Sequence, residues 1–194
     1  GDSRWVTGET ARRHVHETRN RLPAIMVGIG TVLEDDPLLT FRIDGGRDPI
    51  RVICDSRART PIDSRIVQTA NKIPTYIAVV GRNERTAELE RHGVHILECK
   101  TKNERVDLAD LMRQLGALGI DGLLLEGGSA LAFSALEAGV VHRVQAYIAP
   151  KIIGGADAKS PVGGLGFDKI VQALPLKDVT CTPMDEDFLI EGRL

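Results

Sequence analysis

The segment from Leu123 to Leu136 constrains the fold more than any other, because it predicts a strand, a tight turn and a helix in succession. Three consecutive leucines are typical of a strand that is buried on both faces in the middle of a parallel sheet. Gly127 and Gly128 end that strand at a sharp turn, and Ser129 is a candidate cap for the helix. The first amide N–H groups of such a helix lack intrahelical partners, so they favour an anion such as phosphate at the carboxyl edge of the sheet.

Glu126 places a negative charge between this predicted strand and the predicted anion site. A carboxylate is costly in an apolar core unless it has a partner. Two interpretations are open from the residues alone. Either Glu126 hydrogen-bonds to a neighbouring turn, or a bound ligand uses its charge.

The rest of the chain alternates between strand-like and helix-like segments. Apolar runs predict strands at 24–27, 49–54, 75–80, 94–97 and 144–149, and helices are predicted at 9–22, with Thr7 as its cap, and at 84–91, 107–118 and 130–139. This alternation predicts an α/β fold of three layers, in which helices flank a mainly parallel sheet. Extended segments at 177–184 and 187–194 predict a C-terminal antiparallel hairpin on the edge of that sheet. No linker divides the 194 residues, which favours a single domain.

Composition and charge exclude several classes of protein. The net charge is −2 and the basic residues are scattered, so we expect no nucleic-acid partner. No apolar run approaches the roughly 18 residues of a membrane span and no signal-peptide core stands at the start, so we expect a cytoplasmic protein without membrane contact. The cysteines at 54, 99 and 181 have no disulfide or metal-ligand spacing, so we expect three reduced packing residues and no metal site.

Glycine-rich segments give weaker signals. Gly28 and Gly30 follow a predicted strand, but a dinucleotide-binding fingerprint of the Rossmann type needs a third glycine at position 33, where the chain has leucine. A standard Rossmann domain is therefore disfavoured, although two glycines still let the backbone approach a ligand, and Thr31 adds a hydroxyl group. Five more glycines lie between positions 154 and 166 and predict a loop that is either a ligand cover or a connector.

Several charged residues are candidates for ligand contacts. Arg19 continues the apolar face of the first predicted helix, so its guanidinium needs an anion there, either an internal carboxylate or a ligand phosphate. Arg42 ends a short apolar segment and is a second candidate for gripping an anion. Asp35 and Asp36 precede Pro37, a pattern that fits acid/base chemistry, metal ligation or an ordinary turn.

Ser56 closes the strand predicted at 49–54, and Arg57 and Arg59 follow it closely. A hydroxyl group followed by two arginines fits the 2′-phosphate of an adenine dinucleotide, since guanidinium is the usual means of accepting it. A solvated loop is the competing interpretation.

Four blocks of the sequence resemble the pyrimidine reductase of riboflavin biosynthesis. They are Met26–Thr40, Pro49–Ser56, Leu125–Ser129 and Tyr147–Lys151, in the family's order and with similar spacing over nearly the whole chain. The resemblance implies a fold like that of dihydrofolate reductase, NADPH as the cofactor, and a homodimer. It also implies reduction of the ribose of 5-amino-6-(5-phosphoribosylamino)uracil to a ribityl group, without a metal. The alternatives are a reductase of the 2,5-diamino-pyrimidine ribosyl phosphate or of a pterin-like substrate, and a nucleotide-binding module without catalysis.

The resemblance implies roles for individual residues. The nucleotide site would comprise Trp5, Thr31, Asp35, Ser56, Gly128, Ser129, Ala130, Leu131, Ala132, Phe133 and Ser134. The substrate site would comprise Ser3, Arg19, Leu39, Arg42 and Glu126, with both arginines on the sugar phosphate. Glu126 would orient the ribose hydroxyls and offset the positive charge that develops at C1′, and Asp35 would act nearer the cofactor, mainly by positioning.

Members of the family carry a first strand, with a lysine and a Ser-x-Asp-Gly turn, ahead of the segment that corresponds to Ser3–Trp5, where this sequence begins. That strand would be central in the sheet. We expect its residues to exist in the protein, because a missing central strand would leave two rows of backbone groups unpaired in a core. In bacteria the reductase usually forms the C-terminal half of a bifunctional deaminase-reductase, whereas archaeal and fungal relatives stand alone.

Overall fold

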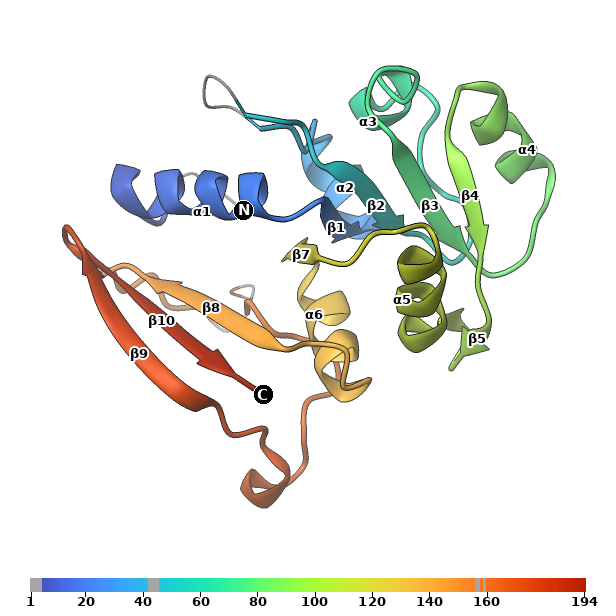
Figure 1. The fold of residues 1–194 in the computed structure, drawn as a ribbon. Helices are drawn as coiled ribbons and strands as arrows, with labels where there is room; N and C mark the ends of the chain where they lie inside the picture. Colours follow the sequence, from blue (N-terminus) through green and yellow to red (C-terminus); the bar gives the residue numbers. More distant parts are fainter. Residues whose placement is uncertain (1–4, 42–45, 156–157, 159) are drawn as a thin grey trace.

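The computed structural model describes residues 5–41, 46–155, 158 and 160–194, which form two principal β-sheets with helices around and between them (Figure 1). The helices are α1 Glu9–Arg21, α2 Ile29–Asp35, α3 Arg65–Gln68, α4 Glu84–Arg91, α5 Leu108–Ala117, α6 Ser129–Glu137 and the short 3₁₀ helix η1 Ile170–Gln172. The strands are β1 Ala24–Gly28, β2 Ile50–Cys54, β3 Thr75–Val79, β4 His95–Glu98, β5 Thr101–Lys102, β6 Arg105–Val106, β7 Leu123–Gly127, β8 Arg143–Ile148, β9 Lys177–Met184 and β10 Asp187–Arg193. No helix in this part of the chain is long and apolar enough to cross a membrane.

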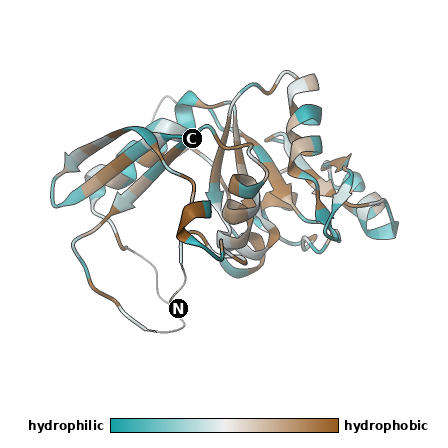
Figure 2. Ribbon diagram, turned by 90° about the horizontal axis from the view of Figure 1, so that it is seen from below, coloured by the Kyte–Doolittle hydropathy of each residue, from teal (hydrophilic) through white to brown (hydrophobic). Residues whose placement is uncertain are grey.

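The larger sheet is parallel throughout and has the strand order β4-β3-β2-β1-β7. Because successive residues of a strand point to opposite faces, its side chains feed two separate cores. One core joins Ile25, Val27, Ile53, Ile77 and Val79 to residues of α2, α3 and α4, and the other joins Ala24, Met26, Val52 and Ala78 to residues of α5 and α6. Figure 2 shows hydrophobic residues concentrated in these strands. The predicted three-layer α/β fold is therefore confirmed.

In the sheet that the described residues form, β7 is the end strand and is not buried on both faces, so the predicted burial on both faces is wrong for this part of the chain. Every residue of β7 is half-buried, and among the described strands it pairs only with β1. Leu123 and Leu125 pack against the core that α5 and α6 cover, which accounts for their apolar character without burial of the opposite face.

The predicted C-terminal hairpin is confirmed as β9 and β10, but its predicted place on the edge of the main sheet is wrong. β10 pairs antiparallel with β9 on one side and with β8 on the other, which makes a second sheet of order β8-β10-β9. The physical reason is that β8 takes the free edge of β10. α1 extends over this second sheet (Figure 1), where His14 Nδ1 and Tyr147 Oη are 2.8 Å apart.

Two predicted helix caps are also wrong. α1 is capped by Gly8 in place of Thr7, and the Gly8 N–H donates to Asp187 Oδ2 at 2.6 Å, so a contact from β10 fixes this end of the helix. α6 begins after Gly128, whose φ of +94° is a conformation that residues with side chains rarely adopt. The cap position therefore falls on glycine, and Ser129 is the first helical residue.

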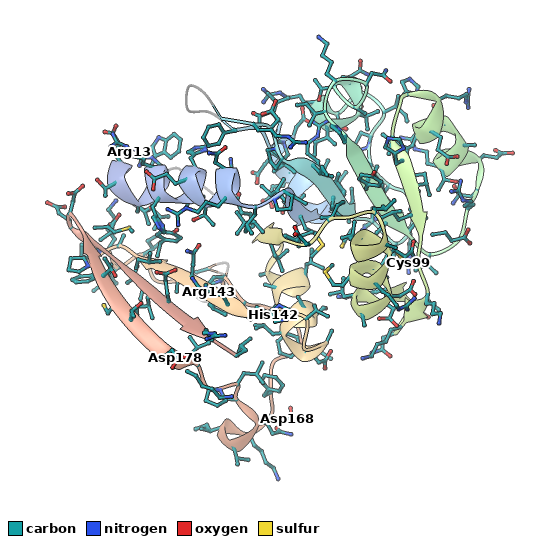
Figure 3. All side chains as sticks on the ribbon, in the orientation of Figure 1. Arg13, Cys99, His142, Arg143, Asp168 and Asp178 are labelled. Atoms are coloured by element: carbon teal, nitrogen blue, oxygen red, sulfur yellow. The ribbon has the colours of Figure 1, made fainter. Side chains whose placement is uncertain are left out.

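Two of the three cysteines pack inside the protein as predicted. Burial raises the pKa of the Cys54 thiol to about 12 and that of Cys99 to about 11, so both are neutral at ordinary pH. Cys99 lies beside α5 (Figure 3), where Gln114 Nε2 donates to its sulfur at 3.6 Å. Cys181 is exposed on β9, so its prediction as a packing residue is wrong.

Asp110 anchors α5 to the end of β4 through a buried carboxylate. Its oxygens accept from the Lys100 N–H at 2.9 Å, from Gln114 Nε2 at 2.9 Å and from Arg113 Nη2 at 2.6 Å. The Lys100 backbone bond is the largest of the effects that lower the pKa of Asp110 to about 2. The ionised form of Asp110 is therefore more stable in the folded than in the unfolded chain.

We expect the Asp110→Asn substitution to destabilise the fold in a pH-dependent way. Because the folded pKa lies below the unfolded value of about 3.9, the Asp110 contribution is present above that pH and is lost as the pH falls towards 2. The urea midpoint measured by circular dichroism should fall at pH 7, and the variant should lose less stability than the parent between pH 4 and 2. Asp121→Asn, at an exposed position, is the control; equal acid dependence in parent and Asp110→Asn would contradict the assignment.

Candidate active site

The turns that follow β1 and β7 lie against each other. These two strands are parallel neighbours, so their carboxyl ends meet at one edge of the sheet. A Cβ atom added to Gly127 would lie 2.8 Å from Thr31 Oγ1, and one added to Gly128 would lie 3.6 Å from the Gly28 Cα atom. Glycine at these positions therefore lets the two backbones approach closely, and it brings the Thr31 hydroxyl beside the end of β7.

Glu126 forms a bidentate ion pair with Arg19, which reaches it from α1. Arg19 Nε donates to Glu126 Oε1 at 2.6 Å, and Arg19 Nη2 donates to Glu126 Oε2. The two side chains are only 15% and 16% exposed, so solvent screens this pair weakly. The internal-carboxylate interpretation of Arg19 is thus the one that the structure contains, and the partner of Glu126 is an arginine side chain and not a neighbouring turn.

Arg19 also contacts the segment that follows α2. Its Nη1 donates to the Thr40 carbonyl at 3.4 Å. Leu39, the preceding residue, has a φ of +53° and a side chain that is buried in the core. Only the backbone of Leu39 can therefore contact a ligand.

The two carboxylates of the Asp35-Asp36-Pro37 segment have different surroundings. Asp36 adopts a left-handed conformation at the end of α2, and its Oδ1 accepts from the Arg65 N–H at 2.8 Å, which is ordinary turn chemistry. Asp35 is the last residue of α2 and is exposed. Of the two, Asp35 is the carboxylate that a ligand can reach.

Ser56 and the two arginines follow β2, the next strand of the sheet after β1. Ser56 Oγ accepts from the Val106 N–H at 3.1 Å, so this hydroxyl has a structural partner. Arg59 Nε is 3.7 Å from Asp55 Oδ1, and the carboxylate of Asp55 is completely buried. Arg57 is 73% exposed, 4.0 Å from Glu104. The end of β2 therefore carries two partly exposed guanidinium groups.

Only some residues of the segment from Gly128 to Ser134 already have partners inside the protein. The Ala132 N–H donates to the Gly128 carbonyl at 2.8 Å, and Ser134 Oγ donates to the Ala130 carbonyl at 3.0 Å. The Phe133 ring packs edge-to-face on Phe167 at 5.3 Å. The backbone groups that can serve an anion thus belong to the first turn of α6, and the last three residues of the predicted set have internal partners.

The glycine-rich segment passes over the start of α6. The Gly163 N–H donates to the Ser129 carbonyl at 3.0 Å, and a Cβ atom on Gly164 would lie 2.8 Å from the Phe133 ring. This part of the predicted loop is packed against the helix whose first turn is the candidate anion site.

Three other predicted residues lie away from these contacts or outside the structure. Trp5 is 65% exposed, and its ring stacks on the Arg12 guanidinium at 4.5 Å. Ser3 and Arg42 lie outside the described residues. No group of three or more His, Cys, Asp and Glu side chains suited to a metal ion occurs within the part of the chain that is described.

Tyr147 is a residue of this region to which sequence reasoning gave no role. Burial is the main cause that raises the pKa of its phenol to about 12, and the negative charges of Glu191 and Glu126 act in the same direction. Its hydroxyl contacts His14 of α1, 133 positions earlier. The sequence holds no local signal for such a long-range contact.

The chain matches known proteins over most of its length. The family model described as the RibD C-terminal domain matches residues 1–190. The chain is 50% identical over 192 residues to the riboflavin biosynthesis protein RibD of Actinobacillus pleuropneumoniae, covering 98% of this chain and 51% of that protein. It is 42% identical over 191 residues to the 2,5-diamino-6-ribosylamino-4(3H)-pyrimidinone 5′-phosphate reductase of Methanothermobacter thermautotrophicus, covering 96% of this chain and 86% of that protein.

The fold agrees with solved structures of the same kind. Acinetobacter baumannii RibD, in its form 2, superposes with a TM-score of 0.82 at 26% identity, over 100% of this chain and 53% of that one. The chain therefore spans about half the length of the RibD proteins that it matches.

Proposed function

Because the chain belongs to the RibD C-terminal domain family, we propose that it is a reductase that uses NADPH to convert the ribose of a ribosylamino-pyrimidine 5′-phosphate into a ribityl group. The observation that carries this proposal is the half-buried Glu126–Arg19 pair beside the glycine-lined start of α6. A carboxylate suits the hydroxyls and the developing positive charge of a sugar, and a guanidinium suits its phosphate.

The residues around this edge fit NADPH. The first turn of α6 offers backbone N–H groups to a pyrophosphate, and Gly127 and Gly128 allow close approach. Arg57 and Arg59 offer guanidinium groups to the 2′-phosphate. NADPH supplies the hydride when it is bound; these residues bind and orient it.

Glu126 and Arg19 have separate tasks in this proposal. Opening of the ribose ring needs a proton on the ring oxygen and leaves positive charge at C1′, which Glu126 offsets while it orients the ribose hydroxyls. Glu126 and Thr40 engage Arg19 through Nε, Nη1 and Nη2, so three of its five N–H groups are used and two can donate to the sugar phosphate. The bound phosphate then fixes C1′ relative to the nicotinamide.

The base of the substrate has two candidates. The first is the aminouracil of 5-amino-6-(5-phosphoribosylamino)uracil. The second is the 2,5-diamino-pyrimidine, which is favoured by the name of the archaeal relative, a protein that the chain matches over 86% of its length.

We also propose that the domain pairs with a second copy of itself. Large hydrophobic side chains are exposed on β8, β10 and the segment between β8 and β9, among them Ile148, Ile152, Ile153, Leu165, Phe167, Ile170, Val171 and Phe188. Ile148 and Phe188 are cross-strand neighbours, so these two exposed side chains form one apolar patch. Burial of such a surface favours association.

The first strand that the resemblance implies fits the arrangement of the two sheets. β7 uses one edge to pair with β1, and β8 uses one edge to pair with β10; no further partner of either strand occurs among the described residues. β8 is the strand of the smaller sheet that lies toward α6 and β7 (Figure 1). We propose that the family's additional strand would pair with these edges and complete a single reductase domain.

The assay that tests the function follows NADPH oxidation at the nicotinamide absorbance, with the aminouracil and diamino-pyrimidine ribosyl phosphates side by side. We expect oxidation with both and faster turnover with the aminouracil. Faster turnover with the diamino compound would favour the second candidate. No oxidation with either would contradict the proposed reductase and would leave a nucleotide-binding module.

The two substitutions at the ion pair should differ in whether the larger change is in KM or in kcat, although each also removes the partner of the other residue. We expect Arg19→Ala to raise KM for the phosphorylated substrate about tenfold to hundredfold, because a charge-assisted hydrogen bond contributes about 1.5–3 kcal/mol. Glu126→Gln should mainly lower kcat. Steady-state kinetics measures both, with Arg21→Ala as the control on an exposed position of the same helix. Unchanged turnover of Glu126→Gln would remove the proposed role of the carboxylate.

The arginines after β2 should determine the preference for NADPH over NADH. We expect the double substitution Arg57→Ala and Arg59→Ala to raise KM for NADPH about tenfold or more and to leave KM for NADH nearly unchanged, because only NADPH carries the 2′-phosphate. Arg91→Ala, an exposed position on α4, controls for general charge loss. Equal effects on the two cofactors would show that these arginines do not recognise the 2′-phosphate.

A further inference from the structure

Arg51 is a completely buried arginine of β2 to which neither the sequence nor the proposed function gives a role. Its Nε donates to Thr75 Oγ1 at 3.0 Å. Its Nη1 donates to the Leu38 carbonyl at 3.2 Å and to Thr69 Oγ1 at 2.8 Å. Its Nη2 donates to Thr75 Oγ1 and to the carbonyls of Ile66 and Ile73, at 2.6, 3.0 and 3.2 Å. The whole guanidinium fork is therefore engaged.

Burial of a charged guanidinium in a core costs free energy. Burial lowers the pKa of Arg51 to about 10, which leaves it charged at pH 7, and Asp48 opposes that effect from a distance. The hydrogen-bond partners of Arg51 are all neutral. A buried charge ordinarily needs a countercharge. Apolar side chains of similar volume can often replace buried charged groups without loss of stability. What a hydrophobic residue could not supply is the set of donors to three backbone carbonyls. Their geometry is the property that Arg51 maintains.

One of these carbonyls belongs to the candidate site. Leu38 precedes Leu39, whose φ of +53° is an unfavourable conformation for a residue with a branched side chain. The Thr40 carbonyl, on the other side of Leu39, accepts from Arg19. The strained residue is thus held between two guanidinium groups, Arg51 before it and Arg19 after it. Such strain persists only where the surroundings fix it.

We propose that Arg51 is a positioning residue for the reductase site. By holding the Leu38 carbonyl, it keeps Leu39 in its left-handed conformation and the Thr40 carbonyl within hydrogen-bonding distance of Arg19. Arg19 in turn aims the carboxylate of Glu126. The kinetic consequence rests on the proposed function, whereas the structural link does not: Arg51 and Arg19 bind carbonyls on either side of Leu39 in the Leu38–Thr40 segment.

Arg51→Lys tests this inference, because a lysine has three donors on a single nitrogen and cannot span the same acceptors. Two hydrogens report the turn by nuclear magnetic resonance: the Arg19 Nε–H, which donates to Glu126, and the Phe41 amide, which donates to Asp48. We expect both to exchange with solvent about tenfold faster in the variant, and KM for the phosphorylated substrate to rise about tenfold while KM for NADPH stays within about twofold.

Asp110→Asn is the matched control, since it destabilises the fold from α5 without touching the turn. It should leave both KM values unchanged. It should also leave the Arg19 and Phe41 exchange rates unchanged, once these are corrected for the lower stability of the variant. Thr75→Val is a milder, nearly isosteric variant that removes the acceptor of Nε, and it carries the test by the same criteria if Arg51→Lys does not fold.

Parental exchange rates at Arg19 and Phe41 in the folded variant would overturn the inference. A parent protein that oxidises no NADPH with either substrate would contradict the proposed function instead, and the exchange rates would still decide the role of Arg51. The two failures are therefore distinguishable.

Discussion

The ion pair between Arg19 and Glu126 is the interaction on which the candidate site depends. It joins α1 to β7 across 107 positions of sequence, with both groups largely removed from solvent. Loss of either partner would leave the other as an uncompensated, half-buried charge, which is the costly way to break such a pair. α1 also reaches the second sheet through the Gly8–Asp187 contact, so the helix that aims Glu126 is fixed at both ends by residues that are distant in sequence.

The pair also gives the site a charge distribution that suits a phosphorylated sugar. A lone carboxylate at position 126 would repel a phosphate. With the guanidinium of Arg19 beside it, the two charges compensate locally, and the remaining N–H groups of Arg19 present positive charge to an incoming anion. The two interpretations of Arg19 that the sequence leaves open, an internal carboxylate or a ligand phosphate, are therefore compatible in one residue.

Local sequence pattern predicted the elements well because they depend on neighbours in the chain. α4 is found at the predicted residues 84–91, and the strands of the parallel sheet begin and end within about two residues of the predicted bounds. Strand order, the second sheet and the place of β7 were missed because they depend on which distant strand pairs with which edge. The same holds within the site. Arg19 and Glu126 were each identified by a charge on an apolar segment, but their mutual contact was not. The role of Arg51 cannot be predicted from sequence, because one arginine in an apolar strand gives no local signal of its six long-range bonds.

Polar side chains, two of them completely buried, set the shape of the carboxyl edge more than the apolar cores do. Among the described residues after the ends of β1 and β2, three that are not glycine have left-handed backbones: Asp36, Leu39 and Ala58. Each lies beside a hydrogen bond that fixes a turn. Asp36 itself accepts from the start of α3, Arg51 holds the carbonyl before Leu39, and the buried Asp55 accepts from the Thr60 N–H across the turn that contains Ala58.

Directional bonds of this kind specify one conformation where apolar packing would tolerate several, because a hydrogen bond fails with a small change of angle whereas a packing contact does not. The backbone strain of a few kcal/mol at such residues is offset by these bonds. It follows that residues such as Arg51 and Asp55 control the geometry of this edge. Both are completely buried and are not among the residues that a ligand would touch. A substitution there would change the site while leaving its surface composition the same.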